Sequence, residues 1–434
     1  MLRFIAIDGD QPPKRPATTR AGDFREVYAS YAAEKAAEQA SRCSQCGVPF
    51  CQVHCPLANN IPDWLKLTAE GRLEEAYELS QSTNNMPEIC GRICPQDRLC
   101  ERNCVIEQSG HGTVTIGAIE KFLTETAWKE GWVKPLTPRR ERPQSVAVVG
   151  AGPAGLACAE QLRIKGYKVT VFDRHDRAGG LLTYGIPSFK LEKDVVRRRV
   201  KRLAMGGIKF KLNCEIGRDV PFAQLRAGYD AVFVATGAYK ARDAGGPGVP
   251  ALDYLIASNR GSGVLDAKDR DVAVIGGGDT AMDCVRTAIR QGARSVTCLY
   301  RRDRDNMPGS LREVVNAEEE GVAFEWLTLP KSFHGDGVRI SRQRLGLPDA
   351  SGRKAPQEIA GADFTLRADM VIKALGFDPE PEWKALIAQD GVFAGGDLVR
   401  GASLVVWAIR DGRDQAEEIH KYIEKKTALM QAAE

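Results

Sequence analysis

The stretch from Gln144 to Asp173, QSVAVVGAGPAGLACAEQLRIKGYKVTVFD, constrains the fold more strongly than any other part of the chain. It opens with Val146 to Val149, an apolar, β-branched run that is typical of a buried strand. A helix-forming run follows, and then a second short strand that ends at Asp173. Between the first strand and the helix, three glycines have the spacing G-x-G-x-x-G: Gly150, Gly152 and Gly155. A bare glycine triplet often marks only a turn, but the complete unit predicts dinucleotide binding.

Each glycine of this turn has its own physical task. The first permits a tight turn, the second lets the backbone approach a pyrophosphate, and the third lets the helix pack on the strand. The N-terminus of the helix offers unpaired N–H groups to the phosphates. Asp173 stands where a carboxylate can accept a hydrogen bond from a ribose 2′-hydroxyl, so we include it among the binding residues.

The segment from Asp271 to Arg301, DVAVIGGGDTAMDCVRTAIRQGARSVTCLYR, repeats this order of strand, glycine turn, helix and strand. Its turn has the spacing G-x-G-x-x-A, and the residues assigned to cofactor binding are Gly276, Gly278, Asp279 and Thr280. The second strand ends in Arg301 and Arg302 instead of an acid. Arginine binds a 2′-phosphate bidentately, whereas an acid repels it, so this unit is expected to bind NADPH and the first unit FAD. The alternative is that both arginines are ordinary surface residues.

Four residues outside the two units are also expected to bind cofactor: Gly180, Gly237, Gly396 and Asp397. Gly180 brings backbone close to a flat or phosphorylated group, and Gly237 ends a buried strand at the exit of a dinucleotide fold. Asp397 follows a short strand and a glycine, which places a carboxylate near the ribityl–phosphate part of a flavin. Hydride transfer depends on stacking and exclusion of water more than on an acid or base, so we nominate no catalytic proton-transfer residue.

Two blocks of cysteines precede these units: Cys43, Cys46, Cys51 and Cys55, and then Cys90, Cys94, Cys100 and Cys104. Disulfides are disfavoured in a reducing compartment. Structural zinc sites usually have two C-x2-C pairs or cysteine–histidine pairs, and the blocks contain a single C-x2-C. Iron–sulfur ligation fits better, because a cubane takes closely spaced thiolates and a fourth from elsewhere. The blocks therefore predict two [4Fe-4S] clusters, with zinc as the alternative.

Composition limits the other classes of partner. The formal net charge is +4 over 434 residues, which is too small to argue for nucleic acid. The basic run from Arg197 to Arg202 is interpreted as a solvated helix face. No run approaches the ~20 apolar residues of a membrane helix, and the N-terminus lacks the apolar core of a signal peptide, so a cytoplasmic protein is expected. The Ala- and Glu-rich stretch from Asp23 to Ala40 is expected to be helical.

The cysteine blocks, the two glycine units and the C-terminal motif together resemble one family. The phrases RCSQCGVPFCQVHCP, ICGRICPQDRLCERNCV and SLVVWAIRDGRD are similar to the small (β) subunits of bacterial NADPH-dependent glutamate synthases. The resemblance covers almost the whole chain. It implies an α/β protein with two Rossmann-like, disulfide-reductase-like domains, preceded by an α-helical double [4Fe-4S] domain. The implied domains are 1–140 for the clusters, 141–255 plus 377–434 for FAD, and 256–376 for NADPH.

The resemblance also implies function, cluster ligation and partner. Electrons from NADPH pass through FAD and two [4Fe-4S] clusters to a large (α) subunit, whose FMN site makes L-glutamate from 2-oxoglutarate and glutamine-derived ammonia. Ligation crosses between the blocks: Cys43, Cys46 and Cys51 with Cys104, and Cys55 with Cys94, Cys100 and either Cys90 or Glu120. Two connections, 240–265 and 380–391, are shorter than the family leads us to expect.

Two other functions remain open from the sequence. One is an NADPH:ferredoxin oxidoreductase subunit, or one that serves another acceptor. The other is a zinc-bound interaction protein on a flavoprotein fold without activity. Copurification with a large FMN subunit separates the first from the glutamate synthase function, and the colour of the purified protein separates the second.

Overall fold

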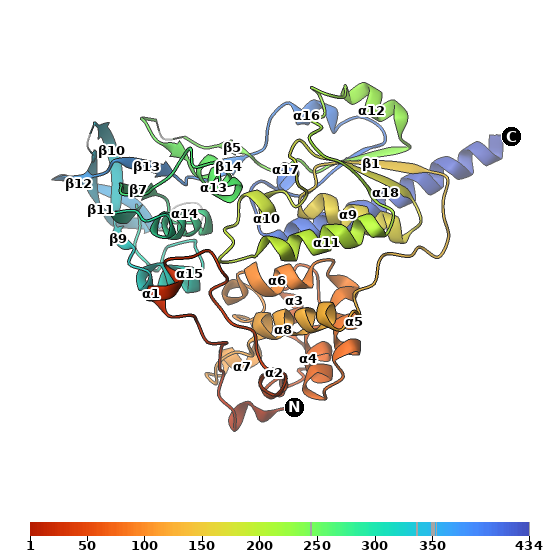
Figure 1. Ribbon diagram of the computed structural model, residues 1–434, viewed down its shortest axis with the longest axis horizontal. Coiled ribbons are helices and arrows are strands. Elements are labelled where there is room, and N and C mark those ends of the chain that lie inside the picture. Colours follow the sequence, from red (N-terminus) through yellow and green to blue (C-terminus); the bar gives the residue numbers. More distant parts are fainter. Residues whose placement is uncertain (244, 336, 349–351, 353, 434) are drawn as a thin grey trace.

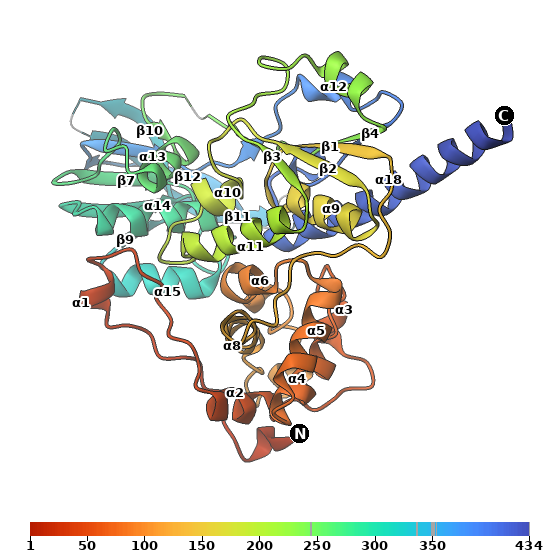
Figure 2. The same cartoon turned by 45° about the vertical axis from the view of Figure 1, so that its right-hand side comes forward.

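The computed structural model describes residues 1–433 apart from 244, 336, 349–351 and 353. The chain forms one helical part and two α/β parts, and Figure 1 shows the helical part beneath the other two. Figure 2 shows the same arrangement after a turn, with the C-terminal helix extending away from the body of the molecule. None of the described helices, including the 29-residue C-terminal one, carries an apolar stretch of the length that a bilayer requires. The predicted fold class is confirmed.

The helical part packs around the buried side chains of Trp64, Tyr77 and Leu123. Its elements are η1 (Arg3–Ile5), α1 (Ala17–Arg20), α2 (Ala33–Ala40), α3 (Phe50–Val53), α4 (Ile61–Ala69), α5 (Leu73–Thr83), α6 (Pro87–Ile93), η2 (Gln96–Arg98), α7 (Val105–Gln108) and α8 (Ile116–Lys129). The helix predicted from Asp23 is wrong over its first half, because α2 begins at Ala33. Residues 21–32 instead form an arm held by tertiary contacts, which outweigh helix propensity.

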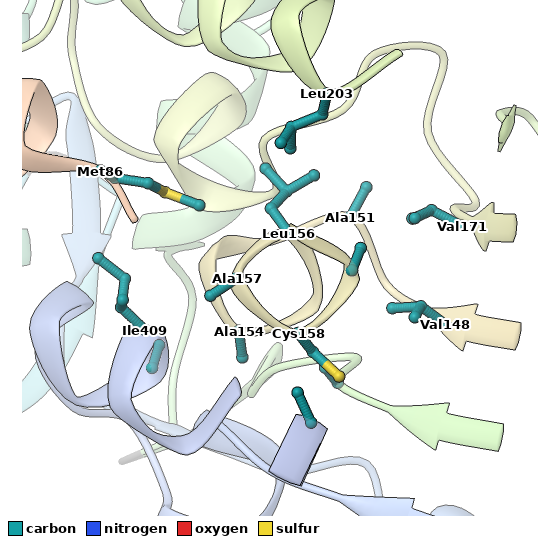
Figure 3. Close-up of a cluster of buried hydrophobic side chains, with 14 of the residues drawn as sticks. Met86, Val148, Ala151, Ala154, Leu156, Ala157, Cys158, Val171, Leu203 and Ile409 are labelled. Atoms are coloured by element: carbon teal, nitrogen blue, oxygen red, sulfur yellow. The ribbon is translucent and has the colours of Figure 1, made fainter. Parts of the chain in front are cut away.

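The first α/β part has five parallel strands in the order β15-β4-β1-β2-β3. Its elements are β1 (Ser145–Val149), α9 (Pro153–Ile164), β2 (Lys168–Phe172), α10 (Leu181–Tyr184), α11 (Lys193–Met205), β3 (Lys209–Lys211), α12 (Phe222–Gly228), β4 (Ala231–Val234), α16 (Trp383–Leu386), β15 (Val392–Ala394), α17 (Asp397–Arg400) and α18 (Val405–Ala433). Figure 3 shows α9 enclosed by side chains from the sheet, α11, α18 and the helical part, among them Val148, Val171, Leu203, Ile409 and Met86. The helical part therefore shares a hydrophobic core with this part.

The second α/β part repeats the design with five parallel strands in the order β6-β13-β7-β8-β9. Its elements are β6 (Val249–Pro250), α13 (Ala251–Arg260), β7 (Asp271–Ile275), α14 (Asp279–Arg290), β8 (Ser295–Tyr300), α15 (Leu311–Glu319), β9 (Ala323–Trp326), β10 (Thr328–His334), β11 (Gly337–Pro348), β12 (Lys354–Arg367) and β13 (Met370–Lys373). An antiparallel sheet of β10, β11 and β12 packs Val338 and Ile340 against Ile275 and Leu299 of the parallel sheet.

A two-stranded ribbon carries the chain between the two α/β parts. It pairs β5 (Lys240–Ala241) with β14 (Phe377–Asp378) in antiparallel register. The boundary predicted after residue 255 falls inside α13, whose Leu252 and Tyr254 belong to the core of the second part. We therefore propose that the chain crosses between the FAD part and the NADPH part at this ribbon. The NADPH part then begins before β6.

The interpretation of the basic run on α11 as a solvated face is wrong for Arg198, Arg199 and Arg202, whereas Arg197 and Lys201 are exposed. Arg199 is buried, and its Nε and Nη2 donate to the two carboxylate oxygens of Glu88 on α6 at 2.6 and 2.7 Å. Arg198 donates to Glu125 on α8. The basic face of α11 thus binds acids of the helical part, which fixes how the two parts lie against each other.

Candidate functional site

The first glycine turn, between β1 and α9, is packed tightly on one side and open on the other. Gly150 has a φ of 105°, and a Cβ on it would lie 2.3 Å from the Ala235 carbonyl oxygen. A Cβ on Gly155 would lie 1.9 Å from the Gly150 carbonyl oxygen, which leaves room only for glycine. A Cβ on Gly152 would meet no atom within 4 Å. The open side is where such turns admit a phosphate to the helix N-terminus.

Asp173 follows β2 and is tied to this turn. Its Oδ2 accepts a hydrogen bond from the Ala151 N–H at 2.7 Å, and its Oδ1 accepts one from the His175 N–H at 2.8 Å. Each carboxylate oxygen has a further lone pair for a ribose hydroxyl. The carboxylate therefore shapes the turn as well as facing the ligand side, which the sequence pattern alone does not indicate.

Two adjoining hollows follow the carboxyl ends of the first sheet. The outer groove has about 1030 Å³ of empty space and the central cleft about 1360 Å³, part of it open to solvent. Gly150, Asp173, Thr236 and Tyr239 line both hollows, which therefore form one continuous channel. Thr236 Oγ1 and His175 Nε2 are buried without a hydrogen-bond partner in the described structure, and both residues line the outer groove. Such unpaired groups fit a long polar ligand of the size of FAD.

The four cofactor-binding residues predicted outside the glycine units all line the central cleft: Gly180, Gly237, Gly396 and Asp397. Asp397 Oδ1 accepts a hydrogen bond from Ser403 Oγ at 2.6 Å, and burial raises the pKa of the Asp397 carboxyl. The first residue of α18, Val405, lines the same cleft. The N-terminus of a long helix thus borders the central cleft.

The second glycine turn, between β7 and α14, repeats the geometry of the first. Gly276 has a φ of 142°, and a Cβ there would lie 2.3 Å from the Ala374 carbonyl oxygen, whereas Gly278 is open. Asp279 and Thr280 line the central cleft. Asp279 Oδ1 accepts a hydrogen bond from the Ser310 N–H at 2.8 Å. Both dinucleotide units therefore open toward one shared space.

The arginines after β8 differ from each other in their surroundings. Arg301 is exposed, whereas Arg302 is only 2% exposed and donates its Nε–H to the Lys354 carbonyl oxygen at 2.8 Å. Neither lines the central cleft, and neither do Gly155, Gly276 or Gly278. Of the pair, Arg301 is the one that is accessible from solvent.

The eight cysteines of the two blocks separate into two groups, each of which combines both blocks. The distal cysteine cavity, with about 320 Å³ of empty space, is lined by Cys43, Cys46, Cys51 and Cys104. The proximal cysteine cavity, with about 430 Å³, is lined by Cys55, Cys90, Cys94 and Cys100, and also by Glu120. This grouping matches the crossed ligation that the family resemblance implies.

The chemistry of the cavity walls suits a group that binds thiolates. Burial raises the pKa of Cys51 to about 12 and that of Cys55 to about 11, so these thiols need a cationic centre to ionise. Burial likewise raises the pKa of Glu120 to about 8. Among the described residues, no three His, Cys, Asp or Glu side chains converge as the ligands of one metal ion do. Four thiols around a hollow fit a cubane, whose ligands stand apart.

The cleft and the two cavities are arranged in series. Cys94 lines both the central cleft and the proximal cavity, and Ile116 lines both cavities. Along α18, Val405 lines the cleft and the next residue, Val406, lines the proximal cavity. Cys46 of the distal cavity is partly exposed. A path of adjoining sites thus runs from the dinucleotide channel to the surface of the helical part.

Five charged residues that line the cleft were not predicted from the sequence: Arg92, Lys190, Asp283, Arg312 and Glu313. Lys190 Nζ contacts Asp283 Oδ1 at 2.9 Å. Asp283 stands four positions after Asp279 on α14, and this helical spacing is the one signal that could have identified it. Lys190 and Arg312 come from outside the glycine motifs, and no local pattern marks them.

Comparisons with known proteins agree with this arrangement. Residues 20–132 match the family described as dihydropyrimidine dehydrogenase domain II, 4Fe-4S cluster, and residues 144–400 match the pyridine nucleotide-disulphide oxidoreductases. FprA of Mycobacterium tuberculosis, solved in complex with NADPH, matches with a TM-score of 0.58 at 19% sequence identity. The matched region covers 66% of this chain and 86% of the FprA chain. That likeness shows the fold of the two α/β parts.

Named relatives match nearly the whole chain. The glutamate synthase [NADPH] small chain of Escherichia coli K12 is 45% identical, covering 98% of this chain and 99% of its own. That of Azospirillum brasilense is 62% identical over 467 positions, covering 98% of this chain and 97% of its own. Because 467 positions exceed the 434 residues of this chain, gaps fall opposite it, as shortened connections would produce. The chain belongs to the family of glutamate synthase [NADPH] small chains.

Proposed function

We propose that this chain is the NADPH-oxidising, electron-input subunit of a glutamate synthase. It takes electrons from NADPH and delivers them, by way of FAD and two [4Fe-4S] clusters, to the FMN of a large (α) subunit. That subunit makes L-glutamate from 2-oxoglutarate and glutamine-derived ammonia. The matched 4Fe-4S and pyridine nucleotide families support the redox groups, and the names of the relatives, which are small chains of glutamate synthase, support the partner.

The observation that carries this proposal is the shared lining of the three hollows. Cys94 borders the dinucleotide channel on one side and the proximal cavity on the other. Ile116 separates the proximal from the distal cavity. Because these sites adjoin in this order, we infer that electrons pass from the channel to the proximal cavity, then to the distal cavity and then to the partner.

The residues of the chain bind, orient and exclude water. We assign FAD to the glycines of the first turn, Asp173 and Asp397, and NADPH to the second turn and Arg301. When bound, FAD supplies the exchange between two-electron and one-electron chemistry, and the clusters carry single electrons. No residue of the cleft is assigned a proton transfer, because stacking and exclusion of water suffice for the hydride step.

Cysteine substitutions test both the clusters and their crossed ligation. Purified anaerobically, Cys94→Ser and Cys104→Ser should each reduce the iron from about eight to about four atoms per chain while FAD is retained, because each removes one ligand set. Cys43→Ser combined with Cys104→Ser should lose no more iron than Cys104→Ser alone, since both line the distal cavity. Loss of all iron from that double variant would contradict the grouping, and a colourless protein that contains zinc would contradict the clusters.

We propose that Cys90, and not Glu120, completes the proximal site. Both line that cavity, but Glu120 Oε1 is already 3.4 Å from both Ser80 Oγ and Asn84 Nδ2. A thiolate is also the commoner cubane ligand. In the same iron analysis, Cys90→Ser should lose the proximal cluster, whereas Glu120→Gln should retain about eight iron atoms. The reverse result would assign the ligand to Glu120.

The partner and the compartment are the remaining parts of this proposal. Copurification with a large FMN-containing subunit and glutamate formation by the complex would support it, and reduction of ferredoxin with no such subunit would favour the ferredoxin alternative. None of the twelve cysteines, all of which are among the described residues, is paired in a disulfide, which supports a reducing compartment such as the cytoplasm.

A further inference from the structure

The loop between two ligands of the proximal cavity touches the NADPH part directly. It is η2, which lies between Cys94 and Cys100. Arg98 Nη2 donates to Asp279 Oδ2 at 2.7 Å, at the first residue of α14. Asp97 Oδ2 accepts a hydrogen bond from Ser310 Oγ at 2.8 Å. The cluster loop and the dinucleotide turn are therefore in contact before any cofactor bridges them.

Gln96 joins the two sites through its side-chain amide. The Nε2 donates to the Cys90 carbonyl oxygen at 3.0 Å, and the Oε1 accepts from Arg312 Nη2 at 3.1 Å. Gln96 is 2% exposed and lines the proximal cavity. Its amide is held in place by Gly117, where a Cβ would lie 2.4 Å from Nε2. One buried amide thus links a wall residue of the proximal cavity to an arginine of the cleft.

Arg312 is the cationic end of this link. It lines the central cleft together with Asp279 and Thr280, at the N-terminus of α14. Its Nε is buried without a hydrogen-bond partner in the described structure. Arginine has five N–H donors and binds phosphate bidentately, so a partly buried guanidinium with an unused donor in this position suits an anion.

We propose that Arg312 and Gln96 form a positioning pair that couples binding of the dinucleotide phosphates in the cleft to the reduction potential of the proximal [4Fe-4S] cluster. The proposal rests on the proposed function, since it requires both groups. A positive charge near a cluster stabilises its reduced form and raises its potential. An anion that neutralises Arg312 removes this stabilisation, so binding in the cleft lowers the potential.

The coupling has a consequence for turnover. Linkage is reciprocal, so if the bound dinucleotide disfavours reduction of the proximal cluster, reduction of that cluster weakens dinucleotide binding by the same factor. An electron that reaches the proximal cavity would then promote release of the spent NADP⁺. The pair would thus order the two events, electron delivery first and release of the product second.

The test is a redox titration of the anaerobic holoprotein, followed by electron paramagnetic resonance. The ligand is 2′-phospho-ADP-ribose, which has the phosphates of NADP but no nicotinamide and so accepts no electrons. The proximal signal is the one that Cys94→Ser abolishes. With ligand, the wild-type ratio of reduced to oxidised proximal cluster at a fixed potential should fall about tenfold, a shift of about 59 mV for a one-electron centre.

Four variants separate this coupling from a merely structural role. Arg312→Gln should have a lower potential without ligand and no shift with it, whereas Arg312→Lys, which keeps the charge, should retain a shift. Gln96→Met should reduce the shift. Arg102→Gln, which removes an exposed charge beside the same cysteine block, should leave it unchanged.

The wild-type protein alone can overturn the inference. If both cluster signals are present and the ligand binds without moving the proximal potential, the inference fails while the proposed function stands. An undiminished shift in Arg312→Gln would overturn it as well. If the holoprotein shows no cluster signal at all, the proposed function itself fails, and the inference fails with it.

Discussion

At the scale of single residues, Arg301 and Arg302 show how neighbours in the sequence acquire different roles. Successive side chains at the end of a strand point to opposite faces. Arg302 therefore lies under β12, bonded through Nε to the Lys354 carbonyl oxygen, while Arg301 remains exposed. Selection of the 2′-phosphate should accordingly depend on Arg301, and Arg302 should contribute mainly to stability.

Alanine substitution of these two arginines should therefore affect two different properties, nucleotide binding for Arg301 and stability for Arg302. Arg301→Ala should weaken NADPH binding about 10- to 100-fold, because a charge-assisted hydrogen bond to phosphate is worth about 1.5–3 kcal/mol, with little effect on NADH. Arg302→Ala should cost about 1–3 kcal/mol of unfolding free energy, since the Lys354 carbonyl loses its donor. Titration calorimetry with both nucleotides and denaturant unfolding measure these quantities. Equal losses of NADPH and NADH in Arg301→Ala would place selection elsewhere.

At the scale of secondary-structure elements, α11 attaches the first α/β part to the helical part. Arg199 is buried and forms a two-pronged ion pair with Glu88 of α6. Arg197, two positions earlier, points to solvent with a side chain that is 73% exposed. The two arginines belong to one basic run, but only one of them holds two parts of the molecule together.

Substitution of these two arginines tests that difference. Arg199→Ala leaves the Glu88 carboxylate buried without its cation and should reduce the unfolding free energy by about 3–5 kcal/mol. Arg197→Ala is the matched control and should change it by less than about 0.5 kcal/mol. Urea unfolding of both variants, with the wild type alongside, provides the measurement. Similar small effects in both would show that the ion pair does not hold the interface.

At the scale of the whole molecule, the end of α1 and the second α/β part meet at Glu320. Its carboxylate accepts hydrogen bonds from Arg20 Nε at 2.9 Å, from Arg286 Nη2 at 2.8 Å and from Arg290 Nη1 at 2.6 Å. Burial alone would raise the pKa of Glu320, but the hydrogen bonds from Arg286 and Arg290 outweigh it and lower the pKa to about 2. The α1 helix is thereby tied to the second α/β part by a buried charge.

This network predicts how stability depends on pH. A carboxyl with a lowered folded-state pKa contributes stability that is fully present above its unfolded pKa, about 4.5, and is lost as pH falls toward 2. Glu320→Gln should therefore be several kcal/mol less stable than the wild type at pH 7, and the gap should narrow by about 1 kcal/mol at pH 4. Urea unfolding of both proteins at pH 7, 5 and 4 measures this difference in unfolding free energy. The other titrating groups contribute equally to both proteins and therefore cancel. A gap independent of pH would contradict the lowered pKa.

Several features could be predicted from the sequence because they depend on residues that are close together in the chain. Position 155 must be glycine, because a Cβ there would lie 1.9 Å from the Gly150 carbonyl oxygen. The spacing of the glycines in the sequence already indicates this requirement. The two cysteine blocks likewise indicated thiolate ligation, although their spacing did not show that Cys104 joins Cys43 rather than Cys100. That crossed grouping followed from the family resemblance, and the fold brings it about by passing both blocks around one core.

The sequence by itself thus determined the chemistry of this protein, namely two dinucleotide turns and two sets of thiols, because each is encoded by residues close together in the chain. Only the tertiary structure decided how these sites are connected. Arg199, Gln96 and Arg312 acquire their roles from elements that are distant in the chain but adjacent in space. The physical reason is that burial and ion pairing depend on which surfaces face each other. The pattern of residues along a short stretch of sequence does not indicate which surfaces these are.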